Sequence, residues 1–164
     1  MQNRRQNQRR YRCNSKDEGM LGSNKTDFND DPKYRVLKWY SVGFLLYGDC
    51  ISVLVNPEKQ ERPSQIQLFF LALNKYVLSA EIAEQCKQHY VIHQSAKAFY
   101  NVVANLIDQP QSRENLVSLF LRVHKLFVNN RVAILYSDPD FLLLFYSMLC
   151  QCIIEVKDWN LNNY

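Results

Sequence analysis

Hydrophobic residues recur every three or four positions along most of the chain after residue 30, which is the spacing of one α-helix face. Polar and turn-forming residues interrupt this pattern at residues 56–63 and 108–111. Glycine is scarce, with four in 164 residues, which disfavours all-β folds with many tight turns. The pattern predicts an all-α protein in which residues 31–164 form an irregular bundle of about five to six helices around a buried C-terminal helix.

That C-terminal helix is predicted from the most apolar run of the chain, Phe141–Ile154. Asp138-Pro139 precedes it and suits a helix start, because aspartate caps the unpaired amides and proline at the first position loses no hydrogen bond. A helix that is apolar on all sides lies in a core or a membrane. Since crossing a bilayer takes about 20 apolar residues and Ser147 and Gln151 interrupt the run, we expect a core helix with Leu144 buried.

The first helix is predicted to begin at Asp31-Pro32 and to end at Asn56-Pro57. The side chains expected to face the core stand at alternating three- and four-residue steps: Leu37, Tyr40, Phe44, Tyr47, Ile51 and Leu54. Gly43 and Gly48 in this helix either let a neighbouring helix approach closely or mark a kink. The alternative is a pair of strands across Tyr34–Val55, because aromatic and β-branched residues are plentiful there.

The middle of the chain, Gln65–Ile107, has helical spacing but is too long for one helix in so small a protein. Breaks are therefore expected near Ser79 and between His93 and Ser95. The predicted helix ends rest on local residue preferences, with Ser64 and Ser112 as N-caps and Asn129-Asn130 in a left-handed turn.

The N-terminal segment, residues 1–30, is polar and is predicted to be a disordered basic arm. It concentrates five arginines before its first acid: Arg4, Arg5, Arg9, Arg10 and Arg12. Arginines in such an arm neutralise nucleic-acid phosphates or direct nuclear import. The alternative is a solubilising tail without a ligand.

The candidate metal ligands are Cys86, His89 and His93, whose spacing would place them on one face of a continuous helix. We nevertheless predict no metal and no cofactor, since a structural zinc site usually takes four protein ligands. The sequence contains no glycine-rich phosphate loop, no nucleophile elbow and no zinc-protease histidine pair. Catalysis is therefore not expected, and the alternative is a small enzyme without a recognisable motif.

Partner and compartment follow from composition. The cysteines show no disulfide or zinc spacing, and four of them, Cys50, Cys86, Cys150 and Cys152, are expected to be small buried hydrophobes in a reducing compartment. Without an apolar N-terminal segment, a nuclear or cytoplasmic location is expected, with no membrane partner. The chain has ten Tyr, nine Phe and two Trp, and a small core does not easily absorb so many rings. The surplus predicts a helical protein-interaction module or complex subunit, and direct nucleic-acid binding is the alternative.

Overall fold

The computed structural model describes residues 32–130 and 138–162, and side chains in the last helix up to residue 156. The prediction of an all-α bundle is confirmed, because these ranges contain five helices and no strand. The proposed strand pair at residues 34–55 is wrong, since that stretch is helical up to residue 53. The helices are α1 (Pro32–Val53), α2 (Arg62–Gln85), α3 (His89–Val103), α4 (Pro110–Asn129) and α6 (Pro139–Asn162).

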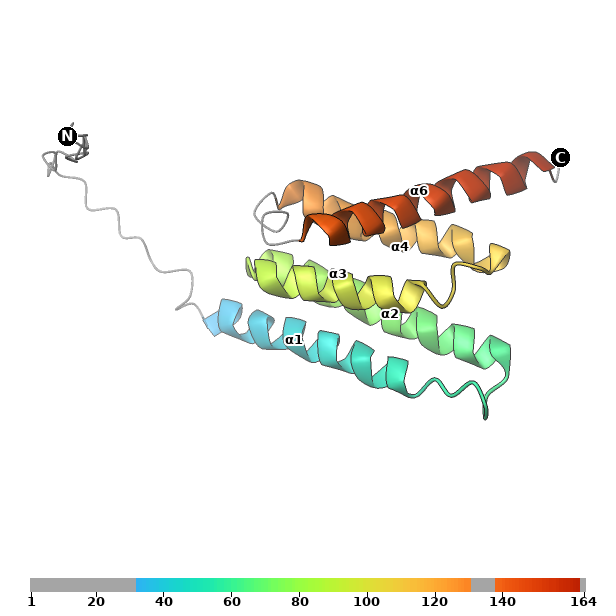
Figure 1. The fold of residues 1–164 in the computed structure, drawn as a ribbon. Helices are drawn as coiled ribbons and strands as arrows, with labels where there is room; N and C mark the ends of the chain where they lie inside the picture. The colour runs from blue at the N-terminus through green and yellow to red at the C-terminus, as the bar shows by residue number, and fades with distance from the viewer. Residues whose placement is uncertain (1–31, 131–137, 163–164) are drawn as a thin grey trace, which may run out of the picture.

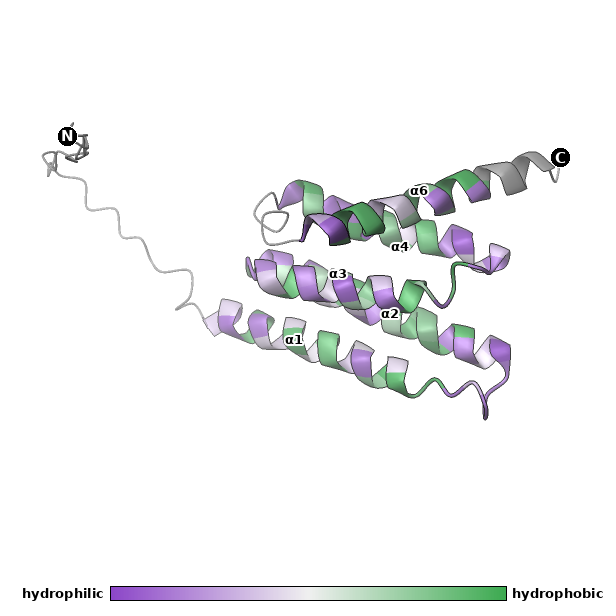
Figure 2. Ribbon diagram, viewed as in Figure 1, coloured by the Kyte–Doolittle hydropathy of each residue, from purple (hydrophilic) through white to green (hydrophobic). Residues whose placement is uncertain are grey.

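The helices lie in three layers (Figure 1), with α1 on one side, α2 and α3 in the middle, and α4 and α6 on the other side. Hydrophilic and hydrophobic bands alternate along the helices (Figure 2), as expected for elements with one covered face and one open face. The helix with the most extensive contacts is α2, which packs against α1, α3 and α4.

The predicted burial of the C-terminal helix is wrong. The structure buries one face of α6, formed by Phe141, Phe145, Leu149 and Cys152. Its opposite face is open, with Leu143 70% exposed and Leu144 50% exposed. The reason is position: α6 stands in an outer layer beside α4, so only one side of it meets other helices.

The break between α2 and α3 lies at residues 86–88 and not at Ser79 or His93, as the sequence pattern predicted. Lys87 adopts a left-handed conformation with φ of 54°. The Gln88 amide donates to the Ala83 carbonyl at 2.8 Å, and the Lys87 amide donates to the Glu84 carbonyl at 3.0 Å. This pair of bonds is a Schellman motif, which satisfies the last carbonyls of α2 and turns the chain back.

Other helix ends also differ from the predictions. Both α2 and α4 begin two residues before the serines expected to cap them, with a proline in the first turn of each. Ser112 is instead a buried residue inside α4. Asn130 ends α4 with φ of −113°, so the expected left-handed turn does not form there.

Small residues form the seam between α1, α2 and α3. Ala72, Ala80, Ala83 and Ala96 are fully buried, as is Ser41 on α1. A Cβ placed on Gly48 would stand 2.5 Å from Cε1 of the Tyr76 ring. The prediction that a glycine lets a neighbouring helix approach closely is therefore confirmed at Gly48.

Aromatic rings instead fill the space between α3, α4 and α6. The Phe145 ring is central to this cluster and is fully buried. Ring centroids lie 5.1 Å away at Phe120, 5.6 Å at Phe127 and 6.1 Å at Phe141. Such edge-on and tilted contacts add about 0.5–1.5 kcal/mol per pair beyond the apolar area they bury.

Two of the described helices, Arg62–Gln85 and Pro139–Val156, are long and apolar enough to cross a membrane. This is weak evidence of insertion, because the core helix of a water-soluble protein has the same length and composition. The first is covered by three other helices, and the second contributes Phe145 to the core. The absence of a membrane partner stays a prediction.

Candidate functional site

The orientation of α1 about its own axis is fixed by its inner face. The Ser79 hydroxyl of α2 donates a hydrogen bond to the Ser41 carbonyl at 2.6 Å, and this hydroxyl also lies 2.9 Å from the Ser95 hydroxyl of α3. Nearer the C-terminal end of α1, the Tyr76 hydroxyl of α2 donates a hydrogen bond to Oδ1 of Asp49 at 2.9 Å. With three helices tied at these points, the opposite face of α1 is held toward solvent.

The Tyr76 hydroxyl remains protonated and can donate this hydrogen bond at neutral pH. Burial raises the pKa of Tyr76 to about 12, and the neighbouring Asp49 carboxylate acts in the same direction. The phenol therefore keeps its proton at neutral pH, and the bond to Asp49 persists. This bond fixes the part of α1 next to Gly48.

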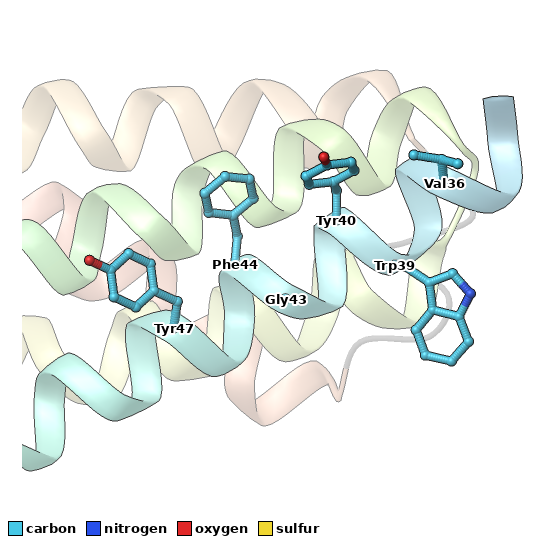
Figure 3. Close-up of a pocket in the computed structure, with 6 residues that line it drawn as sticks. All are labelled: Val36, Trp39, Tyr40, Gly43, Phe44 and Tyr47. Carbon is cyan, nitrogen blue, oxygen red and sulfur yellow. The ribbon is translucent and has the colours of Figure 1, made fainter.

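The outward face of α1 is hollowed and almost wholly apolar. A depression of about 390 Å³ is lined by Val36, Trp39, Tyr40, Gly43, Phe44 and Tyr47, all from this one helix. We call it the α1 hollow. Figure 3 shows four of these side chains in a row along one edge of the helix, Trp39 pointing to the other side, and Gly43 between them.

These side chains were only partly expected at the surface. The sequence pattern assigned Tyr40, Tyr47 and Leu54 to the core, but they are 58%, 50% and 63% exposed. The face that packs is instead rotated toward Ser41 and Gly48, because small residues let the α1 backbone approach α2 closely. A search for large apolar residues at helical spacing does not see such a face.

A cation stands at the edge of the α1 hollow. The Lys75 ammonium of α2 lies 5.6 Å from the Phe44 ring centroid and 5.2 Å from that of Tyr47, both within cation–π range. Lys75 therefore places a positive charge at this edge of the hollow.

The candidate metal ligands are not on one helix. Cys86 is the C-cap residue of α2 and is buried, and its thiol donates a hydrogen bond to the Ile82 carbonyl. His89 begins α3, and His93 is buried with its ring edge-on to Phe141 at 5.4 Å. Burial, with help from nearby Lys97, lowers the pKa of His93 and favours the neutral ring. Within the ranges described, no group of three or more His, Cys, Asp or Glu side chains could hold a metal ion.

The expected burial of all four helical cysteines is wrong for two of them. Cys50 and Cys150 are exposed, whereas Cys86 and Cys152 are buried. Burial raises the pKa of Cys152 to about 11, so this thiol stays protonated and unreactive at neutral pH. The two exposed thiols weaken the argument from buried cysteines to compartment, and the nuclear or cytoplasmic location stays a prediction.

The arginines of the predicted arm, at positions 4, 5, 9, 10 and 12, lie outside the described residues. The feature that the structure adds is the α1 hollow. The sequence signal for it was the surplus of aromatic residues, which indicated a partner surface without locating it.

Comparison with protein-family models, with curated proteins and with solved structures finds no match for this chain.

The chemistry that the α1 hollow offers is binding. Its lining supplies aromatic faces, two tyrosine hydroxyls and no acid, base or thiol. Its volume falls in the range of about 300–1,000 Å³ found for small-molecule pockets, which bury most of a ligand's surface. A hollow lined by one helix lacks an opposite wall, so a small molecule would stay largely in water. The surface is better suited to a macromolecule that brings its own apolar face.

Proposed function

We propose that the protein is a non-enzymatic interaction module, or a subunit of a larger complex, and that the α1 hollow is its docking surface for another protein. One observation carries this proposal: α1 turns its small residues inward and its aromatic residues outward. Buried aromatic residues are enriched at interface cores, where a few of them supply most of the binding energy. Trp39 is 74% exposed, so most of its side chain adds no hydrophobic stabilisation to the fold.

The concentration of apolar surface on α1 supports the same proposal. Of the fourteen large hydrophobic side chains exposed in the described residues, six lie on this helix: Val36, Trp39, Tyr40, Leu46, Tyr47 and Val53. Scattered exposed hydrophobics are ordinary on protein surfaces, whereas a contiguous group marks an interaction site.

The basic arm, residues 1–30, precedes α1 directly in the chain. We propose that it adds nonspecific attraction to nucleic acid or directs nuclear import, and that the protein works in the nucleus or cytoplasm. Arginines in such an arm act through counterion release, so their contribution to binding should weaken as salt rises.

The test is site-specific photocrosslinking in cells. A photoreactive phenylalanine analogue replaces Trp39 in the α1 hollow, and in a matched variant it replaces Tyr90, an exposed aromatic residue on α3. We expect discrete protein adducts from position 39 and not from position 90. The absence of protein adducts at 39, or the same adducts at both positions, would contradict the proposal. Nucleic-acid adducts at 39 would favour direct nucleic-acid binding instead.

A further inference from the structure

We infer that the partner presents an amphipathic α-helix to the α1 hollow, with a large apolar side chain over Gly43 and an acidic side chain toward Lys75. The inference rests on the proposed function and specifies its partner. Three features of the described residues carry it: the notch at Gly43, the spacing of the surrounding side chains and the charge at the edge of the hollow.

The notch at Gly43 is a place where a side chain of another helix can enter. A Cβ added to Gly43 would meet nothing within 4 Å, so the helix surface is open there. Trp39 and Tyr47 stand on either side of it, one turn away in each direction along α1. A large apolar side chain entering this notch would lie against the α1 backbone with aromatic faces around it. This is the knob-into-hole arrangement of packed helices.

The spacing favours a helix over an extended segment. The row Val36, Tyr40, Phe44 and Tyr47 advances by four, four and three residues, which spans about 16 Å along the helix axis at 1.5 Å per residue. Side chains at such intervals form ridges and grooves that accept the ridges of another helix. An extended peptide that binds by strand addition needs a sheet edge, and the described residues contain no sheet.

The charge favours an acidic partner. Lys75 lies over the Phe44 and Tyr47 rings, so its ammonium is already held at the edge of the hollow. A partner carboxylate one turn from the apolar anchor would meet Lys75, whereas a lysine at the same place would be repelled.

The test uses two synthetic peptides of about 18 residues, or five helical turns. They share one apolar face of leucine and phenylalanine and differ only in carrying glutamate or lysine beside it. Titration calorimetry on the full-length protein measures both, with an oligothymidine strand as a third probe. We expect the glutamate peptide to bind about tenfold more tightly at low salt, a difference of about 1.4 kcal/mol. Higher salt should reduce this difference.

Three variants test whether the peptides bind at the α1 hollow. Gly43→Leu fills the notch and should weaken binding of the glutamate peptide about tenfold or more. Lys75→Gln should remove most of the preference for glutamate over lysine. Leu143→Ala, on the exposed face of α6, is the matched control and should change neither the affinity nor the preference. Circular dichroism melts confirm that each variant is folded before its binding is interpreted.

Several results would overturn the inference. Equal affinity for both peptides would refute the acidic partner, and binding that Gly43→Leu leaves intact would refute the notch. If neither peptide binds while position 39 still crosslinks to protein, the docking surface stands and the helical partner is wrong. If oligothymidine binds and the same variants abolish its binding, the occupant is a nucleic acid.

Discussion

The two halves of the bundle bury their surfaces in opposite ways. Between α1, α2 and α3, the contacts rest on small residues such as Ser41, Gly48 and Ala80, and the backbones approach closely. Between α3, α4 and α6, large rings around Phe145 fill the space. The chain therefore has many aromatic residues for two different reasons. Those near Phe145 are core, while Trp39, Tyr40 and Tyr47 on α1 are at least half exposed.

Under the proposed function, this difference locates the apolar surface that a partner would cover. In the aromatic half, the rings around Phe145 are buried by packing, and the large hydrophobic side chains left exposed on α6, such as Leu143 and Leu144, are aliphatic. In the small-residue half, the same close approach that stabilises α1 leaves its large side chains outside. Apolar surface that folding does not bury remains available to a partner, and on α1 it is gathered around one hollow.

The largest expected effect is in the aromatic half. Phe145→Ala should lower the free energy of unfolding by about 3–5 kcal/mol, because it removes a fully buried ring and leaves a cavity. Urea denaturation measures the loss, and Phe145→Leu, which keeps much of the volume, should cost distinctly less. A loss below about 1 kcal/mol for the alanine variant would mean that the rings do not hold this half together.

In the small-residue half, enlarging a side chain should lower the free energy of unfolding. Gly48→Ala should destabilise the protein by about 1–3 kcal/mol, because the new methyl group meets the Tyr76 ring and forces it to move. A double-mutant cycle with Tyr76→Leu checks the cause: the two changes together should cost less than the sum of their separate effects. Simple additivity would show that the Tyr76 contact is not responsible.

Gly43→Ala is the counterpart on the outer face of the same helix. Its methyl group would enter open space, and alanine is favoured over glycine in a helix by about 1 kcal/mol. We therefore expect a small rise in the melting temperature, opposite in sign to the effect of Gly48→Ala. A fall would show that the outer face is more crowded than the structure indicates.

The smallest effect is expected at Leu144. The sequence alone predicts that Leu144 is buried, and truncation of a buried leucine to alanine costs about 2–5 kcal/mol. The side chain is 50% exposed in the outer layer, so we now expect a change below about 1 kcal/mol in a urea melt. A large loss would restore the original view of a C-terminal helix enclosed by the others.

The helix content and most helix positions could be predicted from periodicity, since a three- and four-residue spacing is a local property. Which helix lies at the centre of the bundle could not be predicted in this way. Phe141–Ile154 is more apolar than α2, yet α2 has the most extensive contacts with other helices, while α6 lies in an outer layer. Burial depends on neighbours that the local pattern does not reveal, and an outer helix can expose leucines where a partner or solvent faces it.

The α1 hollow shows the same limit. Its aromatic residues were visible as a surplus, but their direction depends on Ser41 and Gly48, which a search for large apolar residues passes over. The break at Lys87 was missed for another reason. No glycine marks it, and a lysine in the left-handed conformation is unusual enough that residue preferences place the turn elsewhere.

That turn at Lys87 also affects how the chain folds. Only residues 86–88 separate α2 from α3, so these two helices meet after closing a very short loop, at little entropic cost. Contacts between chain neighbours form faster than those between distant segments. We therefore expect the α2–α3 hairpin to act as the early nucleus onto which the other helices condense. Pulsed hydrogen exchange during refolding would then show amides of α2 and α3 protected before those of α6.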